Sequence, residues 1–213
     1  MKKTTHAAEH ERPDIKAARI VWRQAQPSWD SARLVFIDET GLNTKMARLY
    51  GRSPTSQRCV TQVPHRHWQI STFIAALRAE RITAPFLIEG AVNADVFTAY
   101  LQAVLCPELH PGDVVILDNL STHKVPGVAE LITARGASVR YLPPYSPDLN
   151  PIEMAFAKLK ANLRQTAARS LEDLQRGLVQ SLRTFTPAHC QGFFRHAQYA
   201  SIYSVMPNMR LSI

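Results

Sequence analysis

The sequence has few cysteines and no long apolar run. Its three cysteines, Cys59, Cys106 and Cys190, are widely spaced, so neither a zinc-binding cluster nor a disulfide framework is expected, and we predict free thiols in a reducing compartment. No segment approaches the roughly 20 consecutive apolar residues that span a bilayer. The residues that follow Met1 are polar, unlike the core of a secretory signal. We therefore expect a cytoplasmic protein with no membrane partner.

Acidic residues are missing from two long stretches, residues 40–79 and 154–170. Over the whole chain, 25 Lys and Arg outnumber 17 Asp and Glu, which gives a formal charge of +8. Such an excess favours a polyanionic partner, so nucleic acid is expected. Taken singly, each cation is equally compatible with solvated surface charge. The cations of the first stretch are Lys45, Arg48, Arg52, Arg58, Arg66 and Arg78.

The length of 213 residues predicts one substantial domain. Residues 1–30 are polar, with a helix-compatible segment at 15–24, and are interpreted as a lead-in or linker. Residues 31–200 are expected to form the folded domain, and residues 201–213 a tail. The hydrophobic content of 46% is that of a soluble globular protein.

Two short apolar runs each lead into an aspartate. Residues 34–37 end at Asp38 and residues 114–117 end at Asp118, a pattern typical of buried strands that polar turns close. Further strands are predicted at 68–77, 82–88 and 139–142, the first two as a hairpin. Helices are predicted at 93–105, at 126–135, from 151 onward, and at 171–185 and 187–197. These elements indicate an α/β fold in which helices flank a mixed sheet. Both aspartates then lie at carboxyl ends of strands, where open α/β sheets bind ligands.

Strand-end aspartates suit metal-dependent phosphodiester chemistry. A pair of hard cations about 3.5–4 Å apart makes an oxygen nucleophilic and stabilises the leaving oxygen. Mg²⁺ is usually held by a few carboxylates together with phosphate oxygens. Asp38 and Asp118 would supply two such carboxylates, and Glu39 competes with Asp38 because both lie at the predicted turn.

A third carboxylate is available at the start of the helix that follows Pro151. Glu153 is one candidate, but Asn150 and Glu153 also fit an N-cap and its N3 partner, a pair that stabilises a helix by about 1 kcal/mol. Asp148 is the other candidate, and it equally fits a turn-forming residue before proline. The residue pattern alone leaves these alternatives open.

Three segments in this order resemble the mariner-like superfamily of transposases and, within it, the bacterial insertion-sequence branch. They are residues 36–41 (FIDETG), 117–124 (LDNLSTHK) and 141–153 (YLPPYSPDLNPIE). Between Asp118 and Glu153 lie 34 residues, the spacing associated with that superfamily. The likeness continues through residues 185–187 and 193–197, so it covers nearly the whole chain.

The resemblance implies a ribonuclease-H-like fold, with residues 31–200 as the catalytic domain. It also implies that Asp38, Asp118 and Glu153 are the catalytic, metal-binding acids, with Mg²⁺ or Mn²⁺ as cofactor and two ions in the site. On this basis Asp38 is preferred to Glu39, and Glu153 to Asp148.

Asn119 and His123 stand beside the second aspartate in the matching segment. The resemblance suggests that they support the metal ligands or position the substrate. For His123, a residue at a helix start facing solvent is an equal alternative.

The activity that the resemblance implies is cleavage at the terminal inverted repeats of a transposon, followed by attack of the freed 3′-hydroxyl on target DNA, commonly at TA. No covalent protein–DNA intermediate is implied, so Tyr145 and Ser146 need not be nucleophiles.

The expected partners are double-stranded DNA, as transposon ends and target, and a second copy of the chain in a synaptic homodimer. Such transposases carry an N-terminal helix-turn-helix region, but only about 30 residues precede the first strand, so a separately encoded recognition half is also expected. The alternatives are a non-catalytic DNA-binding regulator of transposition and another nuclease of the same fold.

Two cations are predicted to share the Glu153 side of its helix. At 100° per residue, Lys160 and Arg164 return to within about 20° of the Glu153 direction. The apolar stripe of that helix consists of Ile152, Phe156, Leu159 and Leu163, about 100° to one side. We therefore predict that Lys160 and Arg164 contact DNA phosphates, with a solvated helix face as the alternative.

Overall fold

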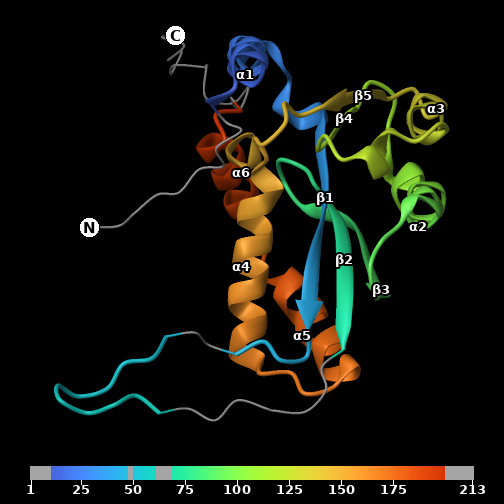
Figure 1. The fold of residues 1–213 in the computed structure, drawn as a ribbon. Helices are drawn as coiled ribbons and strands as arrows, with labels where there is room; N and C mark the ends of the chain where they lie inside the picture. Colours follow the sequence, from blue (N-terminus) through green and yellow to red (C-terminus); the bar gives the residue numbers. More distant parts are fainter. Residues whose placement is uncertain (1–10, 48–49, 61–68, 200–213) are drawn as a thin grey trace, which may run out of the picture.

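The computed structural model describes residues 11–47, 50–60 and 69–199, and in them a five-stranded sheet has the order β3-β2-β1-β4-β5 (Figure 1). Central strand β1 pairs antiparallel with β2 and parallel with β4, so the sheet is mixed, as predicted. The strands are β1 (Leu34–Asn43), β2 (Ile70–Leu77), β3 (Ile82–Glu89), β4 (Val114–Leu117) and β5 (Ser138–Tyr141).

Helices cover both faces of this sheet (Figure 1). They are α1 (Pro13–Ala25), α2 (Ala94–Tyr100), α3 (Val128–Thr133), α4 (Pro151–Thr166), α5 (Leu171–Arg183) and α6 (Pro187–His196). Apolar side chains of α1, α4, α5 and α6 pack in one core with Leu34 and Phe36 of β1. Those of α2 and α3 pack in a second core with Val35 and Ile37 on the opposite face of the strand. The two cores follow from the alternation of side chains along β1.

Strand β1 is longer than the sequence predicted. A turn was expected at Asp38, but the strand continues to Asn43 because β2 pairs with it from Phe36↔Leu77 to Asn43↔Ile70. Thr40 and Leu42 are buried in this extension. The prediction of a turn was wrong because the partner strand lies far away in the sequence.

The remaining elements largely follow the predicted pattern. The hairpin β2–β3 and helices α4, α5 and α6 are confirmed, although Trp68 lies outside the described residues. Helix α2 ends at Tyr100 and continues as a wider π-helical turn over Leu101–Leu105. Helix α3 is shorter than predicted and lies between Gly127 and Gly136, both with positive φ.

Helix α1 lies within the predicted lead-in and packs on the domain. The Trp22 side chain is 9% exposed, and its Nε1 donates to the Tyr199 hydroxyl at 2.9 Å. Gln26 Nε2 donates to the Ala197 carbonyl at 2.9 Å. These contacts join the first described helix to the residues that follow the last one. The domain boundary at residue 30 stays a prediction, and residues 201–213 lie outside the described part.

Candidate active site

The register between β1 and β4 brings two aspartates to the same level of the sheet. Phe36 pairs with Ile116 in the parallel ladder, and Asp38 and Asp118 each lie two residues beyond that pair. Adjacent parallel strands advance at the same rise per residue, so the two acids arrive together. The parallel ladder ends before it reaches them, which leaves this edge open.

Side-chain alternation along β1 separates Asp38 from Glu39. Asp38 shares its face with Leu34 and Phe36, the face that α4 covers. Glu39 shares the other face with Ile37, and its carboxylate contacts His123. The sequence left these two acids as competitors because it placed both at a turn. In the continuous strand, only Asp38 faces α4 and Glu153.

The three predicted acids line one cavity of about 370 Å³. Asp38 comes from β1, Asp118 directly follows β4, and Glu153 lies in the first turn of α4. The proline-rich connector that precedes α4 forms one wall. The other lining residues are Asn119, Leu120, Leu142, Pro143, Pro144, Tyr145, Ser146, Pro147 and Asn150.

Asn150 does not cap α4 with its side chain, so the alternative of a capping pair with Glu153 is excluded. Its amide Nδ2 instead donates to Asp38 Oδ2 at 2.9 Å, and the residue is 3% exposed. A carboxyl oxygen accepts an amide N–H whether the Asp38 group is protonated or ionised. Asn150 Oδ1 is buried with no hydrogen-bond partner among the described residues. No local pattern in the sequence marks Asn150 for this role, because its contact with Asp38 spans 112 positions.

The electrostatics of the cavity are those of crowded carboxylates. Burial raises the pKa of Asp38 to about 8, the Glu153 carboxylate adds to this, and the backbone N–H of Glu39 offsets part of it. Burial also raises the pKa of Glu153, against the opposing charge of Lys160 and with a further contribution from Asp118. The acids therefore repel one another, which a cation between them would relieve.

His123 is fully buried between two carboxylates. Its Nδ1 lies 2.6 Å from Asp118 Oδ1 and its Nε2 lies 3.1 Å from Glu39 Oε2, while its ring packs against Phe97 at 4.2 Å. Burial disfavours the imidazolium, but the hydrogen bonds to Asp118 and Glu39 outweigh it and raise the pKa to about 9. The alternative of a solvent-facing histidine was wrong. His123 and the Leu120 N–H, at 3.1 Å, together orient the Asp118 carboxylate.

The donor set suits a hard divalent cation, although the acids are not closed around a common centre. In the described ranges, no three His, Cys, Asp or Glu side chains form a group that could hold a metal ion as they stand. Asp38 and Asp118 are hydrogen-bonded to protein groups, whereas the Glu153 carboxylate has no such bond within the described part. Carboxylate and amide oxygens are ligands that Mg²⁺ accepts. The raised pKa of Asp38 and the unpartnered Asn150 Oδ1 are both consistent with a site for such an ion.

Two predicted cations lie along α4 beyond Glu153. The charge of Lys160 opposes the rise in the pKa of Glu153, and the seven-residue spacing within α4 puts both residues on one side of that helix. Lys160 and Arg164 are both partly buried, and the predicted apolar stripe of α4 is buried. Their contact with DNA stays a prediction. Arg48 and Arg66 of the basic stretch lie outside the described residues.

The cysteines are free thiols, as predicted. Cys106 and Cys190 are buried, and Cys59 is exposed. A helix long and apolar enough to cross a membrane is not found in the described part of the chain.

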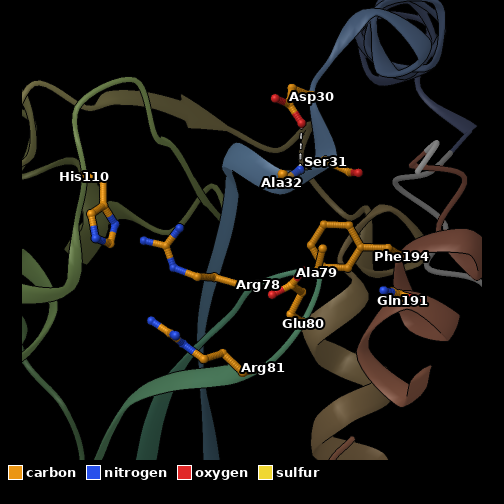
Figure 2. A pocket seen from close by; sticks show the side chains of 10 residues that line it. All are labelled: Asp30, Ser31, Ala32, Arg78, Ala79, Glu80, Arg81, His110, Gln191 and Phe194. Carbon is orange, nitrogen blue, oxygen red and sulfur yellow. Dashed lines mark hydrogen bonds between the residues drawn. The ribbon is translucent and has the colours of Figure 1, made fainter. Parts of the chain in front are cut away.

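A further cavity, of about 440 Å³, lies at the start of β1 and the β2–β3 turn (Figure 2). Its most buried cation, Arg78, bonds to Asp113 at 2.7 Å and to the Glu108 carbonyl at 2.9 Å. Arg81 lies 3.6 Å from the Glu108 carboxylate. These cations are already neutralised, so the cavity lacks the open carboxylate arrangement that the first one has.

Residues 33–175 match the family described as DDE superfamily endonuclease. A comparison with curated proteins gave no match.

Solved structures of Mos1 transposase share the fold. The Mos1 paired-end complex with the left transposon end has a TM-score of 0.71 at 16% identity, covering 92% of this chain and 63% of that one. The mariner Mos1 paired end complex with Mg has a TM-score of 0.68 at 16% identity, covering 93% of this chain and 65% of that one. The catalytic domain of Mos1 mariner transposase gives 0.64 at 14% identity, covering 93% and 94%. The chain thus has the ribonuclease-H-like fold of that domain, and it spans 63% of the Mos1 chain in the first complex.

Proposed function

The chain belongs to the DDE superfamily endonucleases, and from this premise we propose that it is the catalytic domain of a mariner-like DNA transposase of the bacterial insertion-sequence branch. Its reaction is cleavage of phosphodiester bonds at transposon ends and transfer of the 3′-hydroxyl into target DNA. The observation that carries the proposal is the meeting of Asp38, Asp118 and Glu153 at one cavity, from three separate elements.

In this proposal Asp38, Asp118 and Glu153 hold Mg²⁺ or Mn²⁺, as two ions. When bound, such ions make a water or a 3′-hydroxyl nucleophilic and stabilise the leaving oxygen. The surrounding residues orient the acids. Asn150 and the Glu39 N–H bind the Asp38 carboxylate, and the Leu120 N–H and His123 bind that of Asp118. A Mos1 paired end complex was solved with Mg, which supports the choice of cofactor.

The proposed partners are double-stranded DNA and a second copy of the chain. The formal charge of +8 supports a polyanionic partner. A Mos1 paired-end complex contains the left transposon end, which supports the choice of DNA. Asn119 lines the cavity beside Asp118, where it would contact substrate.

Incubation with a supercoiled plasmid that carries the ends of the element tests the proposal, with a recognition partner supplied where needed. Nicked circles should accumulate with Mg²⁺ or Mn²⁺ and should not form with EDTA, because the acids alone provide no charge that stabilises the leaving oxygen. Binding of end DNA without any metal-dependent nicking would instead support the non-catalytic regulator.

Lys160→Ala combined with Arg164→Ala should weaken DNA binding for all sequences and lower the salt slope by roughly 1 for each phosphate that is no longer neutralised. The reason is that both cations are placed along the α4 side that carries Glu153. Binding titrations at several salt concentrations measure this. Arg135→Ala combined with Arg183→Ala is the control, since it removes the same charge from exposed sites outside α4. Equal salt slopes of DNA binding for the two double variants would show that Lys160 and Arg164 are ordinary surface charges.

A further inference from the structure

A groove of about 430 Å³ adjoins the catalytic cavity. One wall is α1, through Val21 and Trp22, and the other includes β5 and the proline-rich connector. The groove shares four lining residues with the catalytic cavity, Asn119, Leu142, Pro143 and Pro144. A polymer bound at the acids could therefore pass into this groove without leaving the protein surface.

Arg140 brings a positive charge to this groove. Its guanidinium lies 5.2 Å from the centre of the Trp29 ring, and it is exposed. Among the described residues it has no carboxylate partner, in contrast to Arg19 and Arg23, which both bind Asp148 at 2.7 and 2.8 Å. Stacking on an aromatic face holds the guanidinium in place while its N–H edges remain open. Such an arginine is suited to a phosphate oxygen.

The rest of the groove is mainly apolar, which favours a single strand of nucleic acid over a duplex. Val21 is 65% exposed on α1, facing the groove that Pro143 and Pro144 also line. A duplex presents its charged backbone to a protein surface and would leave these apolar groups uncovered. The faces of unstacked bases can cover them, as in proteins that bind single strands.

We propose that this groove binds an unpaired stretch of the DNA strand next to the scissile phosphate, with Arg140 on a phosphate and the α1 and proline walls against the bases. The inference rests on the proposed function for the identity of the strand. It adds a single-strand subsite on the α1 side of the cavity, away from the cations of α4.

The test compares two probes, a short duplex with an oligo-dT tail and the same duplex with blunt ends. Binding is measured by fluorescence anisotropy in EDTA at several salt concentrations. Arg140→Ala should weaken binding of the tailed probe about tenfold, as expected for removal of one charge-assisted hydrogen bond, and lower its salt slope by roughly 1. The blunt probe should be little affected. Arg135→Ala, at an exposed arginine that does not line the groove, should leave the preference for the tail unchanged.

A second pair of variants avoids the Arg140–Trp29 contact. Val21→Glu and Ile20→Glu place the same charge at neighbouring positions of α1 that are 65% and 56% exposed, so both should fold. Only Val21 lines the groove, so only Val21→Glu should reduce the preference for the tailed probe.

The proposal is overturned if Arg140→Ala and Val21→Glu bind the tailed probe as wild type does, or if they weaken both probes equally. These measurements require no catalysis, so they separate the two conclusions. If tail binding depends on Arg140 but the chain never nicks DNA, the single-strand site in the groove is supported and the transposase activity is excluded. If the chain shows metal-dependent nicking but neither variant changes binding of the tailed probe, the activity is supported and the single-strand site in the groove is excluded.

Discussion

Asp118→Asn is expected to lower Mg²⁺-dependent nicking by at least about a thousandfold, because a metal ion contributes several kcal/mol of transition-state stabilisation that depends on its charged ligands. The amide keeps nearly the same volume and can still accept the Leu120 N–H that now binds Asp118 Oδ1. Folding should therefore persist while the metal site loses a negative ligand. Initial rates of plasmid nicking, with thermal unfolding of the same preparations, measure both effects.

Asp95→Asn serves as the matched control. Asp95 lies in the first turn of α2, is exposed, and does not line the cavity. It should nick DNA at the wild-type rate. Nicking by Asp118→Asn within a few-fold of that rate would remove Asp118 from the metal site.

The metal-free chain should lose stability as the pH rises from about 6.5 to 9, and His123→Gln should remove much of this loss. The ordinary pKa of histidine is 6.5, and in the folded chain that of His123 is about 9. Between these values the folded chain keeps a proton that the unfolded chain has released, so a higher pH favours unfolding. The shift corresponds to an effect of about 3 kcal/mol on the free energy of unfolding. The contribution is complete below pH 6.5 and is lost as the pH passes 9.

The titration of Asp38 also lowers the stability of the folded chain as the pH rises, over a lower pH range. Its pKa rises from 3.8 to about 8 on folding, so the folded chain again holds the extra proton and loses stability as the pH rises through that window. The loss of stability that is due to Asp38 should remain in the His123→Gln variant. Urea unfolding in EDTA at several pH values measures the difference between variant and wild type. His110→Gln, at a side chain that is 71% exposed, is the control. Parallel pH profiles for wild type and His123→Gln would contradict the buried imidazolium.

Elements with a strong local signal were predictable from the sequence. The apolar run of β4 and the stripe of α4 are each encoded within a few consecutive residues, and Asn93 accepts the Val96 N–H as a helix N-cap. Burial of a continuous apolar run or a helical stripe needs no knowledge of the partner. The mixed character of the sheet, with helices around it, could be predicted from the order of these elements.

Features that depend on distant partners had no such signal. The continuation of β1 past Asp38 requires β2, and the Glu39–His123 contact joins residues 84 positions apart. Asn150 has the composition and position of a helix cap, and only the buried Asp38 carboxylate explains why its amide points elsewhere. A site assembled from β1, β4 and α4 is thus visible in the sequence as acids, while the groups that orient those acids are not.

The contacts of Tyr199 have a consequence for the order in which the protein is completed during synthesis. Its hydroxyl accepts from Trp22 Nε1 and donates to the Leu149 carbonyl at 2.8 Å, next to the Asn150 that binds Asp38. The loop before α4 is therefore anchored by the first described helix and by the last described residue. A nascent chain holds all three acids once Glu153 has been made, and Arg19 and Arg23 can then already bind Asp148 of this loop. The hydrogen bond to the Leu149 carbonyl has to wait for Tyr199. The last contact that holds this loop is thus added after the three acids themselves have been made.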